Sequence, residues 1–319
     1  MTVNRYALRR IVLIVPTVWG ITLLAFAVAH LAPGDAAAEA FRRREGRLPS
    51  PPELVFERQE LGLDRPLPEQ YMSWVTNAAQ GDFGASYSSR RPIYDELRRR
   101  IPLTLELTAL AAVIAVLVGL LSGVLAAVHH NRLADQLLRI GSLGGSAVPS
   151  FWLALLLMEL FAVRLSVLHV AGRGSASNLI LPAVTLALAP AAGLARFTRA
   201  TLLETLNEGY VTTALAKGLA GWAVVVKHGL RNCALPLVTA FGTSIGFLLA
   251  GAVVVETVFS WPGMGSFSVE AILERDYPAI QAAVLYAGLV FAVMNLLVDL
   301  SYALTDPRVR LGGATISRR

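Results

Sequence analysis

The sequence predicts an all-α membrane protein with six transmembrane helices, and composition is the first reason. Of the 319 residues, 55% are hydrophobic and 16% are charged, and the mean hydropathy is +0.57. Soluble domains usually carry about 25% charged residues, so this chain is suited to an apolar solvent. The composition excludes an ordinary soluble enzyme, and the absence of a fixed glycine period excludes a collagen-like chain.

The second reason is the number of long apolar stretches. Six of them reach the roughly 20 residues that a helix needs to cross the hydrocarbon core. Five contain no charged residue, and the third contains only Glu159. Strands of a β-barrel would instead alternate and run for about 10 residues each. We expect spans at residues 11–32, 107–128, 140–163, 177–195, 234–255 and 277–298.

The first of these stretches has features of a signal peptide. Arg5, Arg9 and Arg10 precede it, and small residues follow it at 36–40. Its apolar run, 11–32, is nevertheless longer than the roughly 7–15 residues of a signal sequence. We therefore expect a permanent helix.

The distribution of basic residues predicts the orientation. The N-terminus, the loops 129–139 and 196–233, and the tail after residue 298 carry 14 Lys and Arg, whereas the short segments on the other side carry three. The positive-inside rule then places both termini in the cytoplasm. The long segment 33–100 lies on the extracytoplasmic side and has too few large apolar residues for a core of its own. We therefore expect short helices there and a single transmembrane domain over 1–319.

The longest cytoplasmic loop, 196–233, has a distinctive pattern. Its residues favour helix, the pattern breaks at Gly218, and the chain reaches Pro236 at the start of the fifth span. Such a helix, break and second helix form a stiff projection into the cytoplasm. Composition alone leaves a solvated connector and a docking surface equally open.

The motifs in this loop resemble those of a known family. The run from Glu208 to Leu219, with the run from Lys227 to Pro236, is similar to the EAA-type loop of ABC importer permeases in the dipeptide/oligopeptide/nickel branch. Further matching motifs follow the same order along nearly the whole chain: LAPGD at 31–35, LGLDRPLPEQY at 61–71, GDFGASY at 81–87, WPGMG at 261–265, RDYP at 275–278 and TDPRVR at 305–310.

The resemblance implies a type I importer permease fold and a role for the loop. In that family the loop forms a coupling helix that sits in a groove of a cytoplasmic ATPase. Thr212 occupies the position of the glutamate that gives the loop its name, a departure shared with the peptide/nickel branch. The residues to which the resemblance gives the coupling role are Glu208, Tyr210, Thr212, Thr213, Ala214, Lys217, Gly218 and Leu219.

The resemblance also implies partners and a location. The chain would be a multi-pass protein of the bacterial cytoplasmic (inner) membrane, forming half of a translocation path with a second, homologous permease as a heterodimer. Two ABC ATPase subunits would bind inside, and an extracytoplasmic binding protein would deliver a di- or oligopeptide or a nickel chelate. The Arg-rich basic charge fits membrane orientation, and we expect no nucleic-acid partner.

The two lysines indicate where ATP does not bind. A P-loop needs GxxxxGK[ST], but Gly218 follows Lys217 and His228 follows Lys227. The chain is therefore expected to be a transport subunit without enzymatic activity or a cofactor of its own, with ATP and magnesium on partner ATPase chains. The scattered histidines and the single cysteine, Cys233, predict no metal site.

Glu159 is the polar residue for which two interpretations remain. A carboxylate within a span is costly and is often functional, so Glu159 could line the translocation path. Alternatively it lies near the outer interface and pairs with Arg164 just beyond the helix end. For the whole chain, the alternative function is an ion-coupled secondary transporter, a class that commonly shows internal repeats and several midplane charges.

Overall fold

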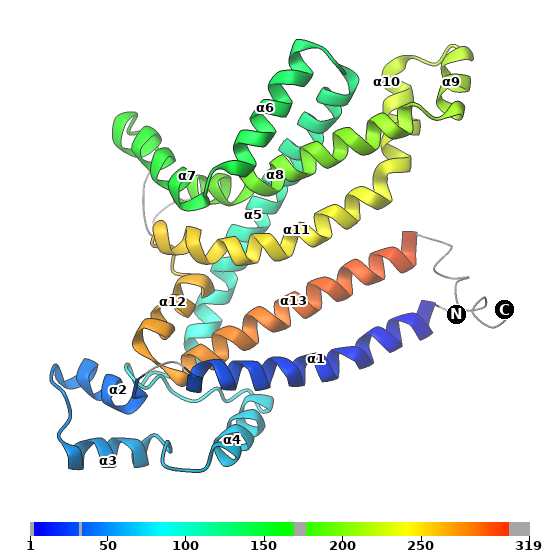
Figure 1. The fold of residues 1–319 in the computed structure, drawn as a ribbon. Helices are drawn as coiled ribbons and strands as arrows, with labels where there is room; N and C mark the ends of the chain where they lie inside the picture. The colour runs from blue at the N-terminus through cyan, green and yellow to red at the C-terminus, as the bar shows by residue number, and fades with distance from the viewer. Residues whose placement is uncertain (1–2, 32–33, 169–176, 306–319) are drawn as a thin grey trace. The chain divides into compact units, whose positions relative to one another are not determined.

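The computed structural model describes residues 3–31, 34–168 and 177–305, and its regular structure over these residues is helical (Figure 1). The chain divides into two compact units. The larger unit comprises 107–259 with both ends of the chain, 1–11 and 293–319. The smaller unit comprises 12–106 and 260–292.

Five long helices coincide with five of the six predicted spans. Their apolar windows satisfy the length and hydropathy that a membrane crossing requires. The helices are α1 (Val3–Leu31), α5 (Ile93–Val128), α8 (Ser177–Leu206), α11 (Arg231–Val258) and α13 (Tyr277–Thr305).

The third predicted span, 140–163, is not one straight helix. Helix α6 (Leu133–Ala147) ends before Pro149, and α7 (Ser150–Leu157) continues into the π-helical turn η1 (Met158–Arg164). The bend of 106° lies between α6 and the segment formed by α7 and η1. Val148 is extended, as expected for a residue that precedes proline, because the proline ring disfavours the helical conformation there. This bent pair is the sixth candidate crossing.

Helix α8 is the centre of the larger unit and packs against α6, α7 and α11. Its approach to α5 depends on two glycines that the sequence places one turn apart. A Cβ on Gly119 would lie 2.9 Å from the Leu194 Cβ, and one on Gly123 would lie 2.6 Å from the Ala195 carbonyl oxygen. Small residues thus let these two helices meet backbone to backbone.

The smaller unit contains the short helices expected in 33–100. They are α2 (Ala36–Glu45), α3 (Pro51–Glu60) and α4 (Leu67–Ala79), and they are joined by α12 (Met264–Glu274). Asp35 caps α2 by accepting a hydrogen bond from the Ala37 amide at 3.0 Å. The core of this unit is shared between the two sequence segments, since Ile93 and Leu97 cluster with Met264 and Phe267.

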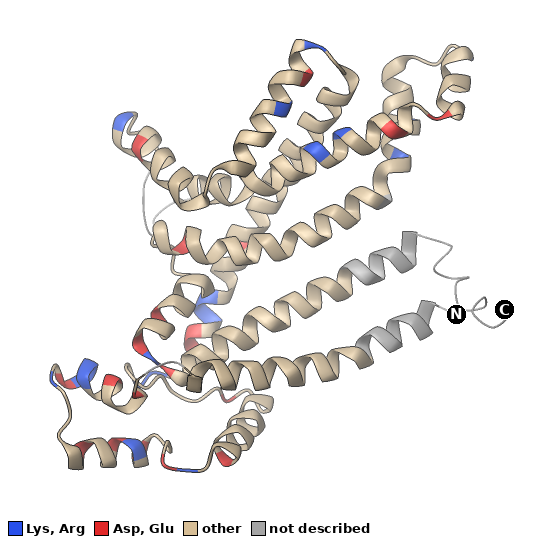
Figure 2. Cartoon of the chain, in the orientation of Figure 1, with Lys and Arg blue, Asp and Glu red and all other residues tan. Residues whose placement is uncertain are grey.

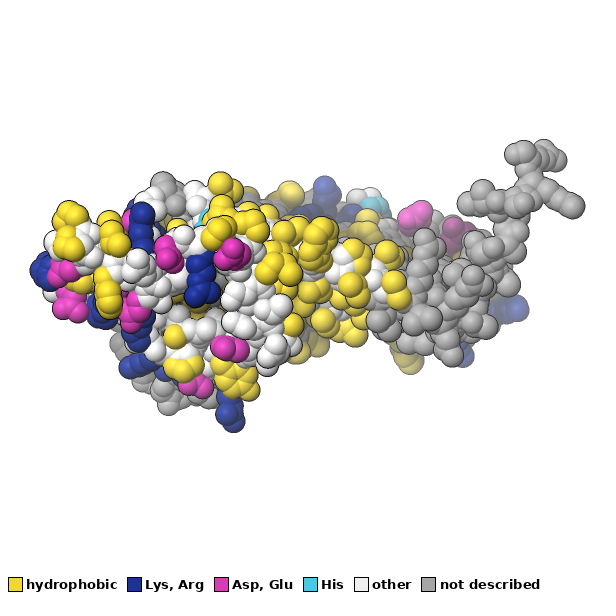
Figure 3. All heavy atoms as spheres, turned by 90° about the horizontal axis from the view of Figure 1, so that it is seen from below, with side chains coloured by type: hydrophobic (Ala, Val, Ile, Leu, Met, Phe, Trp, Pro, Cys, Tyr) yellow, Lys and Arg dark blue, Asp and Glu magenta, His cyan; other side chains and the backbone are white. Residues whose placement is uncertain are grey.

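Charges are concentrated outside the apolar windows of the helices (Figure 2). On the face of the smaller unit seen in Figure 3, basic and acidic side chains alternate over the short helices, and hydrophobic side chains cover the neighbouring part of α1. This pattern is typical of helices that pass from water into lipid.

Candidate functional site

The predicted coupling loop forms two short helices that follow α8. Helix α9 (Gly209–Ala216) begins after Glu208, whose backbone is extended and whose carbonyl accepts the Val211 amide at 2.9 Å. Helix α10 (Gly221–Val224) runs into a second π-helical turn, η2 (Val225–Leu230), and then into α11. Figure 1 shows α9 and α10 at one end of α8 and α11.

Gly218 ends α9 in a defined way. Its φ of +83° lies in the left-handed region, which side chains other than glycine rarely adopt. The Gly218 amide donates to the Leu215 carbonyl at 2.9 Å, and the Leu219 amide donates to the Ala214 carbonyl at 3.3 Å. These two bonds form a Schellman motif, so the break expected at this glycine is a helix C-cap.

The loop has an inner face of its own. Val211 and Ala214 from α9 and Val224 from α10 are buried together, and Leu206 packs against them. Ala214, included among the coupling residues, is therefore an interior packing residue of the loop. The other seven predicted residues are exposed: Glu208, Tyr210, Thr212, Thr213, Lys217, Gly218 and Leu219.

The outer face of the loop is partly apolar. Trp222 is 74% exposed and Leu215 is 50% exposed, and Tyr210, Leu219 and Val226 are exposed as well. None of these residues falls in an apolar window long enough to cross the bilayer. Exposed large apolar side chains outside the membrane commonly mark a surface that binds another protein.

Two contacts hold the loop against the spanning helices. The Asn232 side-chain amide donates to the Tyr210 hydroxyl at 2.6 Å, which joins α9 to the start of α11. A Cβ on Gly229 would lie 2.7 Å from the Leu202 Cδ1, so η2 lies tightly against α8. The loop is therefore in direct contact with both α8 and α11.

A buried ion pair anchors α8 and was not predicted from the sequence. Asp135 is fully buried, and its two oxygens accept from Arg199 at 2.6 and 2.7 Å. The Asn131 amide donates to the same carboxylate at 2.9 Å. The sequence analysis places both residues in cytoplasmic loops. They are 64 positions apart, so no local sequence pattern indicates that they pair.

Glu159 pairs with Arg164. The Arg164 Nε donates to the Glu159 Oε1 at 3.0 Å, and both side chains are at least half exposed. The π-helical turn η1 explains the contact, because its i→i+5 repeat places residues five apart on one face. The contact is the pairing with Arg164 that the second interpretation of Glu159 named, and the path role stays a prediction.

Some predicted features lie outside the described residues. They are most of the segment 164–176 and the TDPRVR motif after residue 305. Among the residues that the structure describes, no group of three His, Cys, Asp or Glu side chains could hold a metal ion.

Comparison with known families identifies the chain. Residues 115–311 match the family described as "Binding-protein-dependent transport system inner membrane component", and residues 3–108 match the N-terminal model of the same system. The chain belongs to this family. It is a permease subunit of an ABC importer, a multi-pass protein of the bacterial cytoplasmic membrane and not an enzyme, which excludes an ion-coupled secondary transporter.

Similar proteins agree with this assignment. The chain is 43% identical over 310 residues to the glutathione transport system permease protein GsiC of Escherichia coli (strain K12), covering 96% of this chain and 98% of the relative. The GsiC of Shigella flexneri serotype 5b is 43% identical with the same coverage.

A solved structure shows the same fold. A chain of the MetNI methionine ABC transporter in an inward-facing conformation aligns with a TM-score of 0.56 and 18% identity, covering 65% of this chain and 95% of that chain. The all-α importer permease fold expected from the sequence is thereby confirmed.

Proposed function

We propose that this permease couples ATP hydrolysis to the import of short peptides of the glutathione type. The observation that carries the proposal is the exposed apolar face of α9 and α10, which stands outside the spans and is tied to α8 and α11. Membership of the family implies that the chain works in a membrane with ATPase subunits and a binding protein as partners. The two ATPase copies and a heterodimeric second permease are part of the proposal.

Seven exposed residues form the proposed contact with the ATPase. Tyr210, Leu219 and Lys217 offer an aromatic ring, an aliphatic side chain and a positive charge on one short loop. Ala214 supports them from inside through the Val211–Val224 cluster. The two compact units act as one permease domain over 1–319, and ATP with magnesium binds only to the partner chains.

The peptide-type substrate is supported by similarity to relatives named for glutathione transport. Nickel chelates are the weaker candidate, since the relatives considered carry no such name. A place for Glu159 in the translocation path remains part of the proposal, with its carboxylate paired to Arg164.

Two glycine-to-alanine variants test the coupling assignment. Gly218 and Gly221 lie three residues apart, and a Cβ at either would meet nothing within 4 Å. Only Gly218 has a left-handed backbone, so only Gly218→Ala strains the chain, by about 1 kcal/mol or more. We expect Gly218→Ala to lower ATPase co-purification and ATP-dependent glutathione uptake.

Gly221→Ala is the matched control and should retain both activities while inserting equally well. If both variants kept wild-type ATPase co-purification and glutathione uptake, the turn at Gly218 would have no role in coupling. The readout is ATPase recovered per permease after affinity purification, together with uptake into proteoliposomes.

A further inference from the structure

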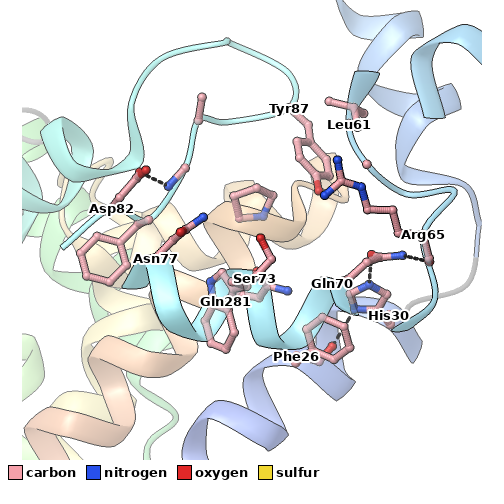
Figure 4. Close-up of a pocket in the computed structure, with 16 residues that line it drawn as sticks. Phe26, His30, Leu61, Arg65, Gln70, Ser73, Asn77, Asp82, Tyr87 and Gln281 are labelled. Atoms are coloured by element: carbon pink, nitrogen blue, oxygen red, sulfur yellow. Dashed lines mark hydrogen bonds between the residues drawn. The ribbon is translucent and has the colours of Figure 1, made fainter. Parts of the chain in front are cut away.

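The smaller unit contains a cavity of about 250 Å³ that is remote in sequence from the coupling loop (Figure 4). The end of α1, the segment 61–65, helix α4, the turn 82–87 and the start of α13 all contribute to its wall. Aromatic rings of Phe26, Trp74 and Phe83 form much of its apolar lining. Five segments thus converge on one partly open space with a polar and aromatic wall.

Some polar groups of the wall are already engaged. The His30 Nδ1 lies 2.9 Å from the Phe26 carbonyl oxygen, and its Nε2 lies 3.2 Å from the Gln70 Oε1. The Gln70 amide nitrogen donates to the Arg65 carbonyl at 2.8 Å. These bonds orient His30 and Gln70 in the wall.

Two other polar side chains belong to the wall. The Trp74 Nε1 is buried and makes no hydrogen bond to a described residue. Gln281 is 5% exposed and lines the cavity. A buried indole N–H without a partner costs about 1–3 kcal/mol, and native proteins rarely leave one. The placement of these two side chains in the wall indicates a polar occupant.

One side of the cavity is rich in hydrogen-bond donors. Figure 4 shows the Tyr87 side chain directed toward the Arg65 guanidinium, and Arg65 makes no ion pair with the part of the chain that is described. Burial raises the pKa of Tyr87, so its phenol keeps its proton at neutral pH and can donate. A guanidinium beside a phenol is a suitable site for a carboxylate.

The other side carries the opposite charge. Asp82 accepts the Gly84 amide at 2.9 Å and forms no ion pair with a described residue. In Figure 4, Asp82 and Arg65 lie on opposite sides of the cavity, and Gln281 lies between them. The order along the cavity is therefore cation, amide and anion.

We propose that this cavity binds the zwitterion of a short peptide. The C-terminal carboxylate lies at Arg65 and Tyr87, the peptide amide at Gln281, and the N-terminal ammonium at Asp82. The volume, below the roughly 300–1,000 Å³ of pockets for drug-sized molecules, fits a ligand of dipeptide size. The site rests on the proposed function only for the choice of a peptide ligand.

The test measures binding of L-alanyl-L-alanine to the intact importer complex in lipid nanodiscs, without its binding protein, by isothermal titration calorimetry. Two capped probes separate the ends: L-alanyl-L-alaninamide lacks the carboxylate, and N-acetyl-L-alanyl-L-alanine lacks the ammonium. We expect each cap to weaken binding about tenfold or more, as the loss of a charge-assisted hydrogen bond does.

Two variants assign the ends to residues. Arg65→Gln should weaken binding of the dipeptide and abolish discrimination against its C-terminal amide, while discrimination against the acetylated probe remains. Asp82→Asn, which keeps an oxygen for the Gly84 amide, should do the reverse. Arg98→Gln, an exposed arginine outside the cavity, is the matched control and should bind as wild type.

Absence of dipeptide binding would overturn the proposal. So would a result in which both variants still bind the free dipeptide more tightly than the two capped probes. A thermal unfolding transition for each variant verifies that the fold is retained, and Trp74→Phe supplies an independent loss of one donor. Coupling is measured separately at Gly218, so failure of this site and failure of the coupling role give different results.

Discussion

At the scale of single residues, Glu57 illustrates how charge stabilises the smaller unit. Its side chain is 2% exposed and accepts from Arg44 at 3.0 and 2.8 Å and from Arg90 at 3.0 Å. The hydrogen bonds from Arg44 hold the pKa of Glu57 below its usual value, against the opposing effect of burial. Both arginines reach it from outside α3, so one carboxylate connects α2, α3 and the segment before α5.

The lowered pKa sets a direction for the dependence on pH. Because the folded pKa lies below the unfolded one, the stabilisation is complete above the unfolded value of about 4.3 and is lost as pH falls through the folded pKa. We expect Glu57→Gln to lower the free energy of unfolding by about 3 kcal/mol at pH 7 and to make the acid dependence shallower. Thermal unfolding recorded at intervals of about one pH unit between pH 3 and 7 measures both the loss of stability and the change in its pH dependence.

Glu60→Gln is the control for that prediction, since Glu60 is exposed and pairs with Arg90 at 3.1 Å. An exposed pair contributes about 1 kcal/mol or less. If Glu57→Gln and Glu60→Gln melted alike at every pH, the buried carboxylate would have no special role.

At the scale of elements, the sequence located the spanning helices but not how they bend or pack. Apolar length predicts a helix, and α1, α5, α8, α11 and α13 appear where it was expected. Pro149 lies inside an unbroken apolar run, so the 106° bend is invisible to hydropathy. The Asp135–Arg199 pair likewise depends on α6 lying against α8, and that contact arises only in three dimensions.

The close approach of α5 and α8 gives an element-scale prediction. A Cβ on Gly123 would meet the Ala195 carbonyl oxygen and the Thr198 Cβ, each at 2.6 Å, whereas one on Gly141 in α6 would meet nothing within 4 Å. Gly123→Ala should therefore force the helices apart and destabilise the protein by about 1–3 kcal/mol. Thermal unfolding in detergent should show the loss.

Gly141→Ala serves as the partner variant. Both substitutions favour helix by up to about 1 kcal/mol, so Gly141→Ala should melt at or above the wild-type temperature. A Gly123→Ala protein as stable as Gly141→Ala would show that backbone contact does not limit this helix pair.

At the scale of the whole molecule, the loop proposed to contact the ATPase was more predictable than the proposed peptide cavity. Its motif indicated both the break at Gly218 and the exposed residues, because a left-handed cap and a projecting helix are local properties. The peptide cavity had no comparable signal. Its wall brings Arg65 and Asp82 together with Gln281, and only the fold of the smaller unit places these residues around one space.

The proposed contact between the α9–α10 loop and the ATPase can be tested by crosslinking from a single cysteine. A variant with Cys233→Ser removes the single native cysteine and allows one cysteine to be placed at Leu219 or, as the control, at Phe56 on α3. Both native side chains are exposed, at 40% and 66%. A photoreactive maleimide is attached in membranes that contain the assembled importer, and the captured polypeptides are identified by mass spectrometry.

We predict that the probe at position 219 captures the ATPase subunit and that the probe at position 56 does not. The proposed contact would be contradicted if the probe at position 56 captured the ATPase. It would also be contradicted if the probe at position 219 captured none in an importer that still transports.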